Sequence, residues 1–202
     1  MTSATEQPTT VRELETPAAR ALTDLAAIFD DLQIVLRCCE RLVAQLDAPS
    51  AEPDDLMLEA LWTTAVLSYG RCFAGGRRGM GLTESDVTAT PLRGEVLRWH
   101  EVLRELREHY AATEENPRER FSVGVAQDSA GQVSGIAITS TSQPRLDDRT
   151  VRQTGALAYE LGKVVDERIT AQQQRVREAA NALSRADVDR LPLVPLVSGY
   201  PS

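Results

Sequence analysis

Aromatic side chains are scarce in this chain, which has two Trp, four Tyr and three Phe among its 202 residues. A core built from stacked aromatic rings is therefore excluded. Alanine and leucine are abundant instead, a composition that favours helices packed by aliphatic side chains. The length suits one domain with short arms and is sufficient to bury a core without disulfides or metals.

Cysteine is also rare, and its count is odd: Cys38, Cys39 and Cys72. An odd number of cysteines predicts reduced thiols in a cytosolic protein. Cys38 and Cys39 are neighbours within a helical pattern, so their side chains point about 100° apart. No His or Asp cluster accompanies them. We therefore expect buried thiols, no metal site and no cofactor.

Long apolar runs are absent, since no stretch approaches the ~18 unbroken apolar residues of a membrane span. The first ten residues, MTSATEQPTT, contain neither a basic segment nor an apolar one. They do not resemble a secretory signal. We expect a cytoplasmic protein that has no membrane partner.

Positive charge is deficient only in the first part of the chain. Residues 1–60 hold twelve acidic residues and four arginines, a net charge of −8, whereas the remainder holds eighteen of each sign. The acidic balance argues against non-specific binding to nucleic acid, and no long basic run occurs anywhere.

Four stretches repeat apolar residues at the three- and four-residue spacing of helices. The first begins at Thr16-Pro17, a capping residue followed by Pro at the first helical position, and ends near Asp47. The second runs from Pro53 to Phe73 and is apolar on almost every side, which predicts a central, buried helix. The third is expected to begin at Thr90-Pro91. The last spans about 147–183, and its apolar face thins at Gln172, where we expect it to project or to contact a partner.

The pattern changes to alternation after the third helix. Phe121, Val123 and Val125 alternate with small residues, and Ile136 and Ile138 follow beyond an Asp/Gly turn. Such runs predict a β-hairpin near residues 121–139. The fold class we expect is mainly α, a bundle of four long helices with one inserted hairpin. Residues 1–15 form a disordered arm, 16–184 the helical domain, and 185–202 a Pro-rich extended tail.

Two short motifs resemble those of HEPN-like bacterial helical proteins. The segment YGRCF at 69–73 resembles the family's YARxF helix end, and LREHYAATEEN at 106–116 resembles its RDKHIAHS helix end. A strand pair and a long final helix follow in the same order, so the resemblance covers about residues 55–170. It implies a helical domain and an RNA-cleaving site made of Arg and His. In that alignment the Arg falls on Arg107 and the His on Thr113, which cannot act as a base at neutral pH.

Other candidate site residues lie nearby. Arg104 and His109 have the HEPN-type spacing, although five helical positions leave them about 140° apart. His100, Arg104 and Arg107 share a helical stripe that could contact phosphate, assisted by Arg71. The interleaved Glu residues favour the other interpretation of this stripe, a solvated face of ion pairs. Arg77 and Arg78, within the glycine-rich loop 75–81, could cradle an anion, or the loop could be a simple connector.

These residues leave three functions open. The one we favour is a non-catalytic, HEPN-like binding or regulatory module that contacts RNA or a nucleotide. The second is a divergent metal-independent ribonuclease using Arg107 or Arg104 with His109. The third is a structural protein that assembles with a protein partner. The long first and last helices also predict a homo-oligomer built on apolar seams.

Overall fold

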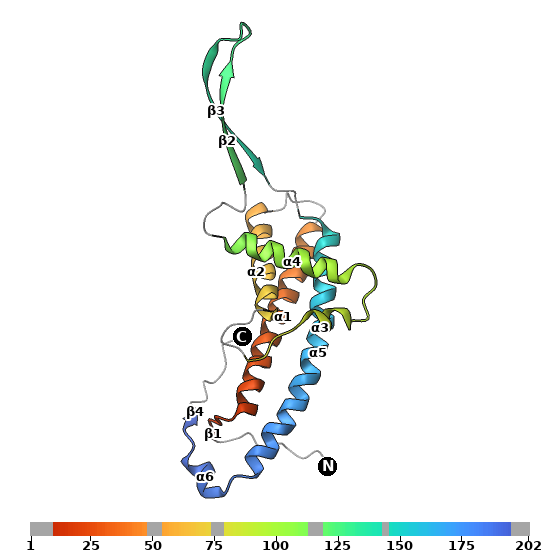
Figure 1. Ribbon diagram of the computed structural model, residues 1–202, viewed down its shortest axis with the longest axis vertical. Helices are drawn as coiled ribbons and strands as arrows, with labels where there is room; N and C mark the ends of the chain where they lie inside the picture. Colours follow the sequence, from red (N-terminus) through yellow and green to blue (C-terminus); the bar gives the residue numbers. More distant parts are fainter. Residues whose placement is uncertain (1–9, 48–53, 74–78, 113–118, 143–145, 195–202) are drawn as a thin grey trace.

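The computed structural model describes residues 10–47, 54–73, 79–112, 119–142 and 146–194. It confirms a mainly helical fold with an inserted hairpin (Figure 1). The long helices are α1 (Pro17–Leu46), α2 (Asp55–Phe73), α4 (Val96–Ala111) and α5 (Asp148–Asn181). The short elements are the helices α3 (Glu84–Thr88) and α6 (Arg185–Arg190) and the strands β1 (Val11–Arg12), β2 (Glu119–Gln127), β3 (Val133–Ser142) and β4 (Leu193–Val194).

Helices α1 and α5 lie antiparallel along most of the molecule and form its longest interface (Figure 1). Their apolar seams face each other, because the residues that recur at helical spacing are the buried ones. These are Leu25, Ile28, Leu32, Val35, Cys39 and Leu42 from α1 and Val151, Leu157, Ala158, Leu161 and Val165 from α5. The seams that predicted an oligomer are thus covered within one chain.

The packing of α5 against α1 continues as far as Gln172, the position from which we expected α5 to project or to contact a partner. Gln172 is 7% exposed, and its side-chain amide donates a hydrogen bond of 2.9 Å to the carbonyl oxygen of Ala18. A glutamine interrupts the apolar seam, but its amide supplies a polar contact at the start of α1. At Gln172 the interface between α1 and α5 therefore changes from apolar packing to a hydrogen bond.

The ends of the long helices follow their capping residues. The Thr16 side chain accepts a hydrogen bond from the backbone N–H of Ala19, and Pro17 is the first residue of α1, as predicted. Asp147 caps α5 in the same way by accepting from Thr150. The predicted start of the third helix at Thr90 is wrong, because Gly94 adopts a φ of 96° and α4 begins only at Val96. A left-handed residue cannot continue a right-handed helix.

The predicted arm and tail meet each other in the part of the chain that the structure describes. Val11 pairs with Val194 and Arg12 with Leu193 in a short antiparallel ladder. The Arg12 guanidinium also donates 2.7 Å hydrogen bonds to the carbonyl oxygens of Asp189 and Leu191. The arm boundary at residue 15 and the extended tail from residue 185 are corrected accordingly, since β1 occupies 11–12 and α6 occupies 185–190. Residues 1–9 and 195–202 lie outside the described residues.

Strands β2 and β3 form the predicted hairpin, longer than residues 121–139 (Figure 1). Its turn is held by the Asp128 carboxylate, which accepts hydrogen bonds from the backbone N–H groups of Ala130 and Gln132, both 2.9 Å long. Gly131, with φ of 78°, supplies the left-handed residue that such a turn requires. The hairpin extends away from one end of the helical bundle. Among the described strands, β2 and β3 pair only with each other.

Candidate functional site

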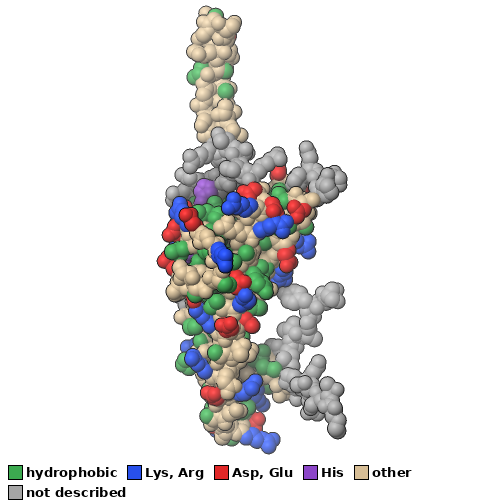
Figure 2. Space-filling model, turned by 90° about the vertical axis from the view of Figure 1, so that its right-hand side faces the viewer, with side chains coloured by type: hydrophobic (Ala, Val, Ile, Leu, Met, Phe, Trp, Pro, Cys, Tyr) green, Lys and Arg blue, Asp and Glu red, His purple; other side chains and the backbone are tan. Residues whose placement is uncertain are grey.

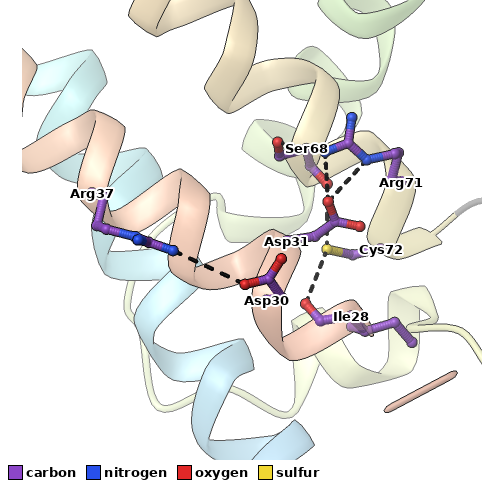
Figure 3. A network of polar contacts seen from close by, with 7 residues as sticks. All are labelled: Ile28, Asp30, Asp31, Arg37, Ser68, Arg71 and Cys72. Carbon is purple, nitrogen blue, oxygen red and sulfur yellow. Dashed lines mark hydrogen bonds and ion pairs between the residues drawn. The ribbon is translucent and has the colours of Figure 1, made fainter. Parts of the chain in front are cut away.

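Arg71 lies at the interface of α1 and α2 and forms an internal ion pair (Figure 3). Its guanidinium donates hydrogen bonds of 2.9 and 2.6 Å to one oxygen of Asp31, a carboxylate that is 5% exposed. It also donates to the Ser68 hydroxyl at 2.9 Å. The hydrogen bonds to Asp31 raise the pKa of Arg71 above its ordinary value. This arginine therefore neutralises a buried carboxylate, which limits what its charge can offer a phosphate.

His100, expected on a solvent-facing stripe, is fully buried between α4 and α2. Its Nδ1 shares a 2.8 Å hydrogen bond with the Tyr69 hydroxyl, and its ring lies 4.4 Å from that of Phe73. Burial lowers its pKa, and repulsion from Arg104 adds to the effect. The stripe prediction is corrected for a simple reason: His100 lies three residues before Leu103, on the side of α4 that packs against α2.

Helix α4 crosses α2 at the point where Arg107 meets Gly70, and the two helices approach closely there. A Cβ placed on Gly70 would lie 2.5 Å from the Cγ of Arg107 and 3.2 Å from its Cβ. The aliphatic stem of Arg107 is therefore a packing element that depends on the missing side chain at Gly70. Arg107 is half-buried as a result.

Arg104 remains exposed but has an acidic neighbour on another helix. Its guanidinium lies 3.7 Å from the carboxylate of Glu84 on α3. The two side chains retain exposed fractions of 53% and 62%, so this ion pair is solvated and weak. The sequence predicted ion pairs within the helix, and Arg98 with Glu101 at 3.1 Å is one of them. The partner of Arg104, however, comes from the α3 segment.

His109, the remaining histidine, lies in the last turn of α4 and is half-buried. Its ring lies 6.1 Å from the ring of Tyr110, at an angle of 64°. Thr113, which takes the place of the family's catalytic histidine in the resemblance, lies outside the described residues. Of the two histidines of the chain, His100 is therefore buried inside the protein and His109 lies at a helix end.

The glycine-rich loop meets a carboxylate of the protein itself. Arg77 and Arg78 lie outside the described residues, but the end of the loop is defined. The backbone N–H groups of Gly79 and Met80 donate hydrogen bonds of 2.8 and 3.2 Å to one oxygen of Asp24 on α1. Two of the donors that could cradle an external anion are thus engaged by Asp24.

The cysteines and the metal-ligating residues do not form a site in the described part of the chain. All three cysteines are buried thiols, as predicted, and burial raises the pKa of Cys39 to about 12. Such a thiol is not nucleophilic at neutral pH. Across the described ranges no group of three or more His, Cys, Asp or Glu side chains could hold a metal ion. Nor does any described helix have the length and apolar character of a membrane span.

The hairpin carries the main exposed apolar surface. Eleven large hydrophobic side chains are exposed in the described residues, and six of them belong to β2 and β3. The strand register places five of these on one side of the ribbon, which we call the apolar face: Phe121, Val123, Val125, Ile136 and Ile138. The opposite side, the small face, consists of Ser122, Gly124, Ala126, Gly135, Ala137 and Thr139.

The exposure of the apolar face was missed by sequence reasoning. Alternation of apolar and small residues normally indicates a strand with one side on the core. Here Val123 is 72% exposed and Ile138 is 71% exposed, because no helix of the described chain covers the ribbon. The absence of charge from 121–142, except for Asp128 at the turn, is a signal that the sequence does contain.

No protein-family model, curated protein or solved structure matches this chain. The resemblance to HEPN domains therefore stays a prediction. What the geometry itself provides is a helical body in which His100 and the aliphatic stem of Arg107 are packed, and a projecting ribbon with uncovered apolar side chains. The first arrangement suits structural support, and the second suits contact with another macromolecule.

Proposed function

We propose that this chain is a non-catalytic interaction module, HEPN-like in its helical body, that engages a protein partner through its β-hairpin. One observation carries the proposal. The apolar face projects from the bundle with its Val, Ile and Phe side chains between 58% and 72% exposed. A two-stranded hairpin alone is at best marginally stable in water, so burial of this face against a partner would stabilise it.

A protein partner fits this surface better than RNA does. Nucleic-acid surfaces present Lys and Arg to phosphates, and the hairpin has none over residues 121–142. Figure 2 shows the same contrast, since the bundle displays many charged side chains while the hairpin displays apolar and uncharged groups in this view. Two of the three arginines suggested for RNA contact, Arg71 and Arg104, each face an acidic side chain.

Site-specific photocrosslinking tests this function. A photoreactive amino acid at Val123 on the apolar face should form covalent adducts with a protein in the cell. The same group at Ser122, on the opposite side of the same strand, is the matched control, and a second control at Arg37 samples the exposed surface of α1. Adducts that are specific to Val123 would support the module. Equal or absent adducts at all three positions would contradict it.

A further inference from the structure

We infer that the partner of the hairpin is a second copy of this chain, with the two apolar faces packed against each other. This inference rests on the proposed function, because it takes the hairpin to be the interaction surface. It goes further by naming the molecule that covers the hairpin and the side of the hairpin that is covered. Three properties of the hairpin lead to it: its charge, its area and its position on the molecule.

The charge pattern favours self-association. The apolar face lacks ionisable side chains, so two identical copies can meet without placing like charges opposite each other. Val123 lies across the ribbon from Ile138, and Val125 lies across from Ile136. Each copy therefore presents two rows of branched aliphatic side chains, which can interdigitate with the same rows of the other copy.

The area is sufficient for a small specific interface. A Val, Ile or Phe side chain buries roughly 100 Å² when it leaves water, so the five members with their flanking atoms would bury about 500–600 Å² per copy. Two copies together would then bury about 1,000–1,200 Å², near the lower end of specific interfaces. We expect a reversible dimer rather than an obligate one.

The position of the hairpin reduces the repulsion between two acidic molecules. The chain has a net charge of −8, which opposes close approach of two bundles. Strands of nine and ten residues extend about 30 Å. When the hairpins overlap head to tail, the bundles lie at opposite ends, separated by more than the Debye length of about 8–10 Å.

The tip of the hairpin argues against a membrane as the occupant. Residues 127–132 read Gln-Asp-Ser-Ala-Gly-Gln, and the turn is organised around the Asp128 carboxylate. A ribbon that inserts into lipid would have to carry this polar segment with it. The large apolar side chains lie along the length of the ribbon, where another ribbon can cover them.

The mass of the full chain in solution, measured by light scattering over a range of concentrations, tests the dimer. The expected mass rises from 22.1 kDa at low concentration to about twice that value at high concentration. Val125→Asp and Val125→Lys should each remain monomeric at concentrations where the unmodified chain is dimeric, a weakening of at least tenfold. Mixing the two variants should restore a dimer that contains one copy of each, because the shared interface then holds charges of opposite sign in place of like charges.

Ser122→Lys supplies the matched control, since it adds the same charge to the small face of the same strand. It should leave the dimer intact, and circular dichroism should report an unchanged helical content for all three variants. A chain that stays at 22.1 kDa at every concentration would overturn the inference. A dimer that survives both Val125 variants would overturn it as well.

The two proposals fail separately. Adducts from Val123 that contain a different protein, in a chain that remains monomeric, would reject the second copy and keep the interaction module. Absence of specific adducts, together with a dimer that neither Val125 variant weakens, would reject both proposals.

Discussion

The carboxylate of Asp31 on α1 receives two hydrogen bonds from the guanidinium of Arg71 on α2, and the acid is buried while the base is half exposed. The pair joins α1 and α2 through two residues that are forty positions apart in sequence. Arg71 is one of the residues that the sequence suggests for RNA contact, yet its geometry is that of a structural cation.

Arg71→Ala should destabilise the fold by about 1–3 kcal/mol, because it removes the two charged hydrogen bonds that Arg71 donates to the buried Asp31 carboxylate. Chemical denaturation monitored by circular dichroism measures this change. The double variant Asp31→Asn with Arg71→Ala should recover part of the loss, since the buried charge is removed as well. A fully exposed arginine on the same helix bundle, Arg185, is the control, and Arg185→Ala should change stability little. An Arg71→Ala chain as stable as the parent would contradict the structural role.

Gly70 and Arg107 should show strong coupling in a double-mutant cycle. Gly70→Ala gains about 1 kcal/mol of helix propensity, but the new Cβ would meet the Cγ of Arg107 at 2.5 Å. We expect a net loss of stability in the parent background. Arg107→Ala removes Cγ and leaves only the 3.2 Å approach to Cβ, so the same glycine substitution should be tolerated there.

The cycle compares the free energy of unfolding of the parent, the two single variants and the double variant. A coupling of about 1 kcal/mol or more is expected for groups in direct contact. Gly162→Ala on α5 is the reference, because a Cβ at that position would meet no atom within 4 Å. Additive effects of Gly70→Ala and Arg107→Ala would show that the helices do not cross as described.

Acid should destabilise the protein partly through His100. Burial holds its pKa below the ordinary value of about 6.5, so the neutral form persists in the folded state while the unfolded chain takes up a proton. The unfolded state therefore binds more protons as the pH falls below about 6.5, and stability declines through that window. Arg104 reinforces the shift, whereas Glu84 and Glu101 oppose it.

His100→Asn tests this account, since the asparagine oxygen can accept a hydrogen bond from Tyr69 and does not titrate. The variant should lose part of the decline in unfolding free energy between pH 7 and pH 5. His109→Asn serves as the comparison at the other histidine. If the two variants follow the parent with the same pH dependence, His100 does not contribute a shifted proton equilibrium.

The purified protein should not cleave RNA in EDTA. The residue aligned with the family's base is Thr113, and His100 is enclosed by Tyr69 and Phe73. Incubation with a labelled single-stranded RNA followed by gel electrophoresis measures cleavage. Activity that His109→Ala abolishes would favour the divergent ribonuclease instead. Salt-dependent RNA binding that is lost on combining Arg104→Ala with Arg107→Ala would favour the RNA-contacting module.

Local sequence determined the secondary structure, because capping, turn chemistry and apolar period act over a few residues. Thr16-Pro17 starts α1, Asp147 starts α5, and Asp128 with Gly131 turns the hairpin. The same local rules failed at Thr90, where the conformation of Gly94 postponed the start of α4. The short helices α3 and α6 carried too little periodicity to be predicted.

Tertiary structure alone decided which chemically interesting residues are available. On an isolated helix the stripe would expose His100 and Arg104 alike. The crossing of α4 over α2 buries His100 and leaves Arg104 exposed. Alternation likewise specified a ribbon with one apolar face, although only the position of that ribbon shows the face uncovered. The physical reason is that periodicity fixes which side chains share a face, whereas packing between distant segments fixes what, if anything, covers that face.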